Sequence, residues 1–124
     1  MSEKNLRTIL VVDDEERFLN SIRRMLFDYP FDIDTAPSVD IALEYLTKKT
    51  YDMILLDYAM PKKTGLDFMK EAKWDRSLTK VILITGHLSP SLADEFYSLG
   101  IDGYMGKPFT QEDLLGLLEY HLPK

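Results

Sequence analysis

Five short apolar runs alternate with five amphipathic stretches along this chain, and this alternation constrains the fold more than any other feature. The first run, residues 8–12, is rich in β-branched residues and continuous, which is typical of a strand covered on both faces. Alternating strands and helices favour a parallel sheet with helices on both sides. We therefore predict an α/β, doubly wound (βα)5 fold with five parallel strands. The expected strands are residues 8–12, 31–36, 53–56, 80–84 and 103–106.

The amphipathic stretches are predicted helices, and their ends have recognisable sequence signals. The first helix is expected to place an apolar stripe on the core and to end at Pro30, and the third to run from Gly65 or Leu66 to Lys73. The stripe consists of Phe18, Ile22, Met25, Leu26 and Tyr29. The end signals are Ser38 and Ser89 as N-caps, Pro90 after the second of them, Gly100 as a C-cap, and Thr110 with Asp113 as a capping box.

Composition restricts the class of protein. The length of 124 residues fits one domain, residues 1–124, and 45% hydrophobic content is ordinary for a globular chain. A formal charge of −6 disfavours nucleic acid and suits divalent cations or basic partner surfaces. The chain has no cysteine, two histidines, a polar stretch at residues 1–4 and no apolar run long enough for a membrane span. We expect a soluble cytoplasmic protein.

Polar residues follow the ends of four predicted strands. Asp13 and Asp14 follow the first strand, Asp57 the third, Thr85 the fourth and Lys107 the fifth. Ligands of open parallel sheets bind outside the carboxyl ends of the strands, so these distant residues are expected to meet at one edge.

The chemistry of this set points to a cation and a phosphoryl group. Three crowded carboxylates repel one another, and a hard divalent cation such as Mg²⁺ relieves that repulsion. A carboxylate can also act as a nucleophile and form an aspartyl phosphate. Lysine and threonine side chains would then stabilise charge on the phosphoryl oxygens during in-line transfer.

The full set of motifs resembles the response regulator receiver family of two-component signalling. The segments involved are Val11-Val12-Asp13-Asp14-Glu15, Leu55-Leu56-Asp57-Tyr58-Ala59-Met60-Pro61 with Gly65, Ile84-Thr85-Gly86, and Gly103-Tyr104-Met105-Gly106-Lys107-Pro108-Phe109. Each segment is weak alone, but four of them in order and register over nearly the whole chain are specific. The resemblance implies a flavodoxin-like sheet with strand order 2-1-3-4-5.

The resemblance also implies roles for individual residues. Asp57 would be the phosphoacceptor, and Lys107 would contact the phosphoryl group. The metal ligands would be Asp14, Asp57 and the carbonyl of Ala59, with Asp13 acting largely through water. Thr85 would move toward the phosphoryl group and Tyr104 would rotate inward, while the bond between Lys107 and Pro108 would be cis. Ala59 and His87 would tune the dephosphorylation rate.

The same resemblance implies partners. The phosphoryl group would come from the phosphohistidine of a sensor histidine kinase or a histidine phosphotransfer protein. Phosphorylation would switch the surface of the fourth helix, fifth strand and fifth helix, and so control a downstream target or a fused output domain. A phosphorylation-dependent homodimer is a further expectation. The chain would be either a single-domain regulator or a receiver cut from a longer protein, acting as a signalling domain and not as an enzyme.

Several other interpretations fit parts of the pattern. A phosphohydrolase with an aspartyl nucleophile usually needs a second acid close after the nucleophile, where this chain has Tyr58 and Ala59. A flavin-binding module would need a phosphate-binding loop after the first strand, where acids would repel phosphate. A third alternative is an interaction domain that is never phosphorylated. Individually, Asp13 and Asp14 could be helix-start acids, and Asp57 and Thr85 could be turn residues. Lys107 could be a surface lysine and Tyr104 a core residue.

Overall fold

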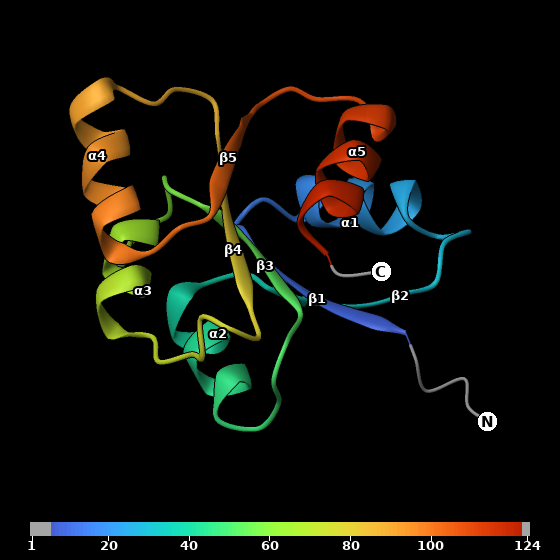
Figure 1. Ribbon diagram of the computed structural model, residues 1–124, viewed down its shortest axis with the longest axis horizontal. Helices are drawn as coiled ribbons and strands as arrows, with labels where there is room; N and C mark the ends of the chain where they lie inside the picture. Colours follow the sequence, from blue (N-terminus) through green and yellow to red (C-terminus); the bar gives the residue numbers. More distant parts are fainter. Residues whose placement is uncertain (1–5, 123–124) are drawn as a thin grey trace.

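The computed structural model describes residues 6–122, and its centre is a parallel five-stranded sheet (Figure 1). The strand order is β2-β1-β3-β4-β5, as expected for a flavodoxin-like fold. Residues 1–5, which include the polar stretch at residues 1–4, and residues 123–124 lie outside the described part. The strands are β1 Arg7–Val12, β2 Phe31–Ala36, β3 Met53–Asp57, β4 Lys80–Thr85 and β5 Gly103–Gly106.

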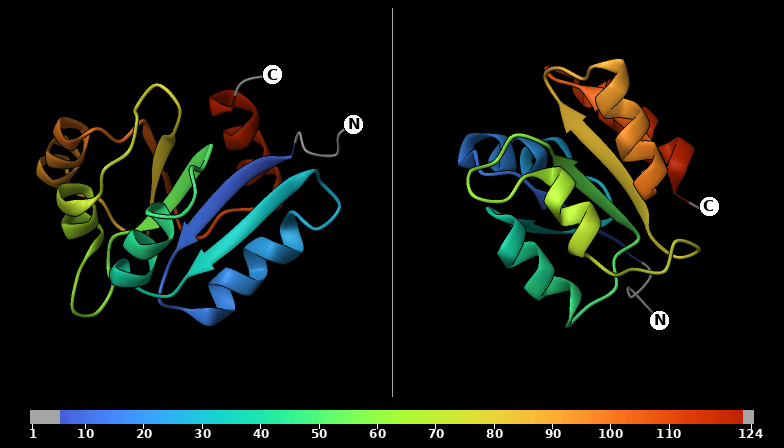
Figure 2. Two further views of the ribbon diagram at one scale, coloured as in Figure 1. Left: turned by 90° about the horizontal axis from the view of Figure 1, so that it is seen from below. Right: turned by 90° about the vertical axis from the view of Figure 1, so that its left-hand side faces the viewer.

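Five helices cover the two faces of the sheet (Figure 2). Helices α1 and α5 lie on one face, and α2, α3 and α4 lie on the other. Within the described residues, no helix is long and apolar enough to span a membrane. The helices are α1 Glu16–Met25, α2 Val39–Leu46, α3 Gly65–Glu71, α4 Pro90–Leu99 and α5 Gln111–His121.

The side chains of the central strands alternate between two hydrophobic clusters. In β3, Met53 and Leu55 pack toward α1 and α5, whereas Ile54 and Leu56 pack toward the other three helices. Successive strand residues point to opposite faces, so a strand covered on both sides must be apolar throughout. This explains the continuous apolar runs of the sequence.

The capping signals are confirmed. The hydroxyl groups of Ser38 and Ser89 accept hydrogen bonds from backbone N–H groups in the first turns of α2 and α4. Gly100 ends α4 in the left-handed region at φ 110°, and Thr110 forms a capping box with Asp113. These short-range signals held because each depends on residues only three or four positions apart.

Two predicted helix ends are wrong. Helix α1 ends at Met25 instead of continuing to Pro30, and Tyr29 is 40% exposed instead of lying on the apolar stripe. Proline disfavours helical backbone at the residue before it, and the chain must reverse before β2 begins at Phe31. Helix α3 ends at Glu71, not Lys73, because Ala72 adopts extended backbone angles.

Candidate functional site

The polar residues that follow the strands meet at the carboxyl edge of the sheet. Asp57 is the last residue of β3 and pairs in register with Ile84, one residue before Thr85. Thr85 in turn pairs with Gly106, directly before Lys107. Parallel strands in register therefore place these side chains at one level, although Asp13 and Lys107 are 94 residues apart in the sequence.

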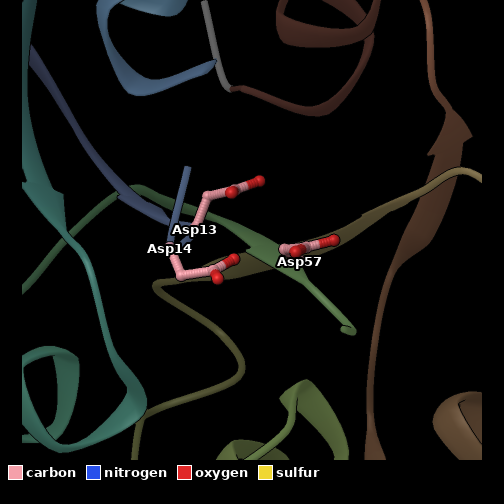
Figure 3. Close-up of side chains that lie close together, drawn as sticks. All are labelled: Asp13, Asp14 and Asp57. Atoms are coloured by element: carbon pink, nitrogen blue, oxygen red, sulfur yellow. The ribbon is translucent and has the colours of Figure 1, made fainter. Parts of the chain in front are cut away.

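Three carboxylates form the centre of this edge (Figure 3). One oxygen from each of Asp13, Asp14 and Asp57 lies within 4.8 Å of the others. Asp13 is fully buried and Asp57 is 7% exposed, whereas Asp14 is exposed to solvent. The cluster is therefore buried on one side and open on the other.

Lys107 supplies the cation of the cluster, and its amine lies closer to Asp13 than to Asp57. Its Nζ donates a 2.7 Å hydrogen bond to Oδ2 of Asp13 and lies 3.7 Å from Oδ1 of Asp57. The aromatic ring of Phe18 lies below the same amine, with its centroid 4.1 Å away. One lysine against three carboxylates leaves an excess of negative charge.

Asp13 has both carboxylate oxygens engaged. Oδ2 accepts the lysine hydrogen bond, and Oδ1 accepts a 2.8 Å hydrogen bond from the backbone N–H of Glu15. Asp13 is thereby held in place at the start of α1, and it in turn fixes the position of Lys107.

Burial and neighbouring charges change the protonation of the site. Burial, reinforced by the charge of Asp13, raises the pKa of Asp57 to about 6, although Lys107 opposes the shift. Burial acts to lower the pKa of Lys107, but its hydrogen bond to Asp13 and the charge of Asp57 outweigh burial and raise it. The lysine therefore remains charged, while the surroundings of Asp57 disfavour its ionised form.

The donor set fits a hard divalent cation. All three ligand groups are carboxylates, and their oxygens are close enough for a single ion to contact them. With both oxygens of Asp13 already accepting hydrogen bonds, Asp14 and Asp57 have the freer oxygens for a metal. A cation here would also relieve the repulsion that raises the pKa of Asp57.

Thr85 and Tyr104 differ in burial. The Thr85 hydroxyl is buried and donates a 3.1 Å hydrogen bond to the carbonyl oxygen of His87, within its own loop. The Tyr104 side chain is 50% exposed on β5 and so is not a core residue. The peptide bond between Lys107 and Pro108 is cis.

Sequence reasoning included Gly65 in the family motif and as a possible helix start, but it did not give a physical reason for a glycine there. Its backbone N–H donates a 2.9 Å hydrogen bond to the carbonyl oxygen of Tyr58, so the loop after β3 folds back against the strand end. A Cβ at this position would collide with the backbone carbonyl oxygen of Asp57. Glycine is therefore required by the close approach of two backbone segments, and no local sequence signal announces it.

Fold and site together define a class of protein. A doubly wound parallel sheet has its ligand site where the strand order reverses, here between β1 and β3, and that is where Asp13 and Asp57 lie. Three acids and one lysine at this point could hold a metal ion, and they differ from the glycine-rich loop of a nucleotide-binding site.

Comparison with known proteins gives the family. The model described as "Response regulator receiver domain" matches residues 9–119, so this chain belongs to the response regulator receiver family. The transcriptional regulatory protein DltR of Streptococcus agalactiae is 34% identical over 107 residues, which are 86% of this chain and 48% of DltR. ResD of Bacillus subtilis, also a transcriptional regulatory protein, is 30% identical over 115 residues, covering 93% of this chain and 48% of ResD.

Solved structures agree with this assignment. The chemotaxis response regulator CheY4 of Vibrio cholerae has a TM-score of 0.86 at 29% identity, with 95% of this chain and 100% of that chain covered. The present chain spans about half the length of the curated relatives named above. It therefore corresponds to the receiver portion of such regulators, and receiver domains of this family act in two-component signalling.

Proposed function

We propose that residues 1–124 form one receiver domain in which Asp57 accepts a phosphoryl group from the phosphohistidine of a sensor histidine kinase or a histidine phosphotransfer protein. The observation that supports this most is the position of Asp57. It ends the central strand β3, it is 7% exposed, and two further carboxylates and one lysine surround it. In the transfer, an oxygen of Asp57 bonds to phosphorus as the bond to the histidine nitrogen breaks, and the imidazole keeps that electron pair.

The residues around Asp57 have separable roles in this proposal. Lys107 would shift from Asp13 toward the phosphoryl oxygens, since its amine is already 3.7 Å from Asp57. Asp13 would keep the amine in reach through its 2.7 Å hydrogen bond. Asp14, Asp57 and the carbonyl of Ala59 would hold Mg²⁺, with Asp13 acting through water. The ion, when bound, would neutralise charge on the phosphoryl oxygens.

The response to phosphorylation would be a two-state switch. A phosphoryl group adds nearly two negative charges at the sheet edge, and the Thr85 hydroxyl would leave the carbonyl of His87 to donate to it. Tyr104 would follow into the space behind Thr85, which changes the surface of α4, β5 and α5. A downstream target or a fused output domain would respond to that surface. Ala59 and His87 would set the rate at which water removes the phosphoryl group.

Intact-mass measurement after incubation with acetyl phosphate and Mg²⁺ tests the acceptor. We expect one labile phosphate adduct on the wild-type protein and none on Asp57→Asn. Asp34→Asn is the matched control, because it removes a carboxylate from a paired cluster elsewhere on the sheet. An adduct that survives Asp57→Asn, or an adduct that depends equally on Asp34, would contradict the assignment. Omitting Mg²⁺ should reduce the yield, and adding it back should restore it.

A further inference from the structure

A hollow lies between the carboxyl ends of helices α3 and α4. The two helices stand side by side on one face of the sheet (Figure 1, Figure 2). The volume of the hollow is about 420 Å³, which is within the range of binding sites for small organic ligands. We call it the α3–α4 hollow, and its lining includes Lys70, Lys73, Trp74 and Arg76 with the apolar side chains of Met69 and Leu99.

The α3–α4 hollow is remote from the carboxylate cluster. Helix α3 ends at Glu71 and α4 ends at Leu99, and each end leads into the loop before the next strand. In a strand–helix–strand unit the helix returns antiparallel to the strands, so its carboxyl end lies near the amino end of the next strand. Asp57 lies at the other edge of the sheet, at the carboxyl end of β3. A ligand in the hollow would not touch it, and the inference does not depend on the proposed function.

Among the described residues, three cations and no acid line the α3–α4 hollow. The carboxylate of the neighbouring Glu71 is paired elsewhere, with its Oε1 2.9 Å from Nζ of Lys63. Within residues 6–122, none of Lys70, Lys73 and Arg76 has an ion pair. Cations without acids are notable in a chain that has 21 acidic and 15 basic side chains. The hollow is therefore a local excess of positive charge on an acidic protein.

The ends of the two helices offset only part of this positive charge. Lys70 lies in the last turn of α3, and Nη2 of Arg76 donates a 3.0 Å hydrogen bond to the carbonyl oxygen of Leu99 at the end of α4. The negative end of a helix dipole amounts to about half a unit charge, so two ends offset about one of the three cations. An anion in the hollow would balance the remaining charge.

The guanidinium group of Arg76 is held in a fixed position. Besides its hydrogen bond to Leu99, it packs on Gly100, where a Cβ would lie 2.7 Å from Cζ of the arginine. A guanidinium has five N–H donors, and the carbonyl of Leu99 is its only acceptor within residues 6–122. Free guanidinium donors form paired, planar hydrogen bonds with carboxylate or phosphate oxygens. Arg76 is thus prepared to hold an acidic group.

The apolar part of the lining includes Trp74, the only tryptophan of the chain. Its Nε1 is the one buried side-chain nitrogen or oxygen in residues 6–122 that has no hydrogen-bond partner. Buried polar groups are almost always hydrogen-bonded, so a small rotation of the ring toward a ligand oxygen would be favourable. The indole ring, with Met69 and Leu99, also offers an apolar surface on which a flat ligand can pack.

We propose that the α3–α4 hollow binds a small organic anion that carries a planar apolar body. The three cations would hold its acidic group, with Arg76 contacting two oxygens, and the body would pack on Trp74 and Leu99. An acidic segment of a partner protein is the alternative occupant. The volume of about 420 Å³ favours a small molecule, because a stable protein interface covers a far larger surface.

Nuclear magnetic resonance of the isotope-labelled full chain tests the inference, because one tryptophan gives one indole N–H signal. The probe is anilinonaphthalenesulfonate (ANS), which has a planar apolar body and a sulfonate with three oxygens, as a phosphate group has. The control probe is phenylnaphthylamine, which has the same body without the charged group. We expect ANS to shift the indole signal and to bind roughly tenfold more tightly than the uncharged probe.

Substitution of the lining cations keeps Trp74 as the reporter. Arg76→Gln should weaken ANS binding roughly tenfold, because it removes the fixed group with paired donors. Lys73→Gln should weaken it roughly threefold, since an exposed and flexible lysine contributes less. The matched control is Arg24→Gln on α1, an exposed arginine on the opposite face of the sheet, and it should leave the affinity unchanged.

The outcomes that would overturn the inference are distinct from those for the proposed function. Equal affinity for the two probes would show that the hollow attracts apolar groups only. An indole signal that stays in place up to about 1 mM ANS would show that no such ligand binds there. A glutamate-rich peptide that moves the signal at a lower concentration than ANS would assign the hollow to a protein partner instead. The Arg76 and Lys73 variants should be phosphorylated at the wild-type rate.

Discussion

Two clusters of aspartate and lysine in this structure are built from similar residues, but their lysines pair with the acids in different ways. One contains Asp13, Asp57 and Lys107 at the carboxyl edge, and the other contains Asp32 and Asp34 of β2 with Lys49. In the second cluster Lys49 donates hydrogen bonds to both acids, at 3.3 and 3.1 Å, and it is about one-third exposed. In the first, the lysine bonds to Asp13 alone and Asp57 lies beyond hydrogen-bond distance.

The pKa of one acid is shifted in opposite directions in the two clusters. The carboxyl of Asp34 is partly buried, which acts to raise its pKa, but a 2.6 Å hydrogen bond from the Tyr51 hydroxyl and its contact with Lys49 lower the pKa below the ordinary value. The pKa of Asp57 is raised to about 6 by burial and by Asp13. The same residue types therefore form a satisfied structural cluster in one place and a site with unneutralised charge in the other. Asp57 differs from Asp34 because its lysine stands 3.7 Å away, whereas the lysine of Asp34 lies within hydrogen-bond distance.

The largest expected effect is the loss of Lys107. Lys107→Met should slow phosphorylation by acetyl phosphate about a hundredfold, because charge on the phosphoryl oxygens loses its only lysine partner in the cluster. Lys49→Met should leave that rate unchanged, since Lys49 serves only the paired cluster. Time courses of adduct formation by intact mass measure both. Equal rates for the two variants would remove the distinction drawn between the clusters.

The pH dependence of stability should have opposite signs for Asp57 and Asp34. The folded pKa of Asp57, about 6, exceeds its unfolded value near 3.8, so its charge destabilises the metal-free fold above pH 6. That penalty, at most about 3 kcal/mol, decreases as the pH falls through 6 and vanishes below about 3.8. Asp57→Asn should therefore stabilise the protein most at pH 7.5 in chelator and hardly at pH 4.

For Asp34 the stability should depend on pH in the opposite direction. Its folded pKa lies below 3.8, so its stabilisation is present above that pH and is lost as the pH falls through the folded value. Asp34→Asn should cost stability at pH 7.5, and the cost should shrink in strong acid. Urea unfolding across the pH range measures both variants, and a parallel pH profile for the two would show that the clusters do not differ.

Backbone packing should also distinguish the site from an ordinary surface. Gly65→Ala should destabilise the fold by about 1–3 kcal/mol and slow phosphorylation, because the new Cβ meets the backbone of Asp57. Gly116→Ala on exposed α5 is the matched control, with no heavy atom close to its Cβ position. It should instead stabilise the protein by up to about 1 kcal/mol, and leave the phosphorylation rate as it is. Destabilisation by both would place the cause in glycine replacement itself.

The smallest effect is expected in the paired cluster. Tyr51→Phe removes the hydrogen bond to Asp34 but leaves Lys49 in place, so the loss should be about 1 kcal/mol. Thermal unfolding should show a drop of a few degrees, while the rate of phosphorylation stays at the wild-type value. A change in that rate would mean that the two clusters are coupled through the sheet.

Local sequence patterns predicted much of this structure. The five strands, the caps at Ser38 and Ser89 and the capping box at Thr110 each depend on residues close in the chain, and all were found. The end of α1 was predicted wrongly, because the apolar periodicity continues to Tyr29 although the chain has to turn toward β2. The carboxylates and Lys107 could be named because each follows a strand, and a parallel sheet brings strand ends together.

By itself, the amino-acid sequence determined the (βα)5 order and the residue types available at the sheet edge, since both follow from periodicity and from strand ends. Only the tertiary structure decided that Lys107 forms a 2.7 Å hydrogen bond to Asp13 and stands 3.7 Å from the buried Asp57. It also decided the close approach of Gly65 to the backbone of Asp57. Distances between residues far apart in the chain arise only when the strands are packed, and electrostatic interactions depend on those distances.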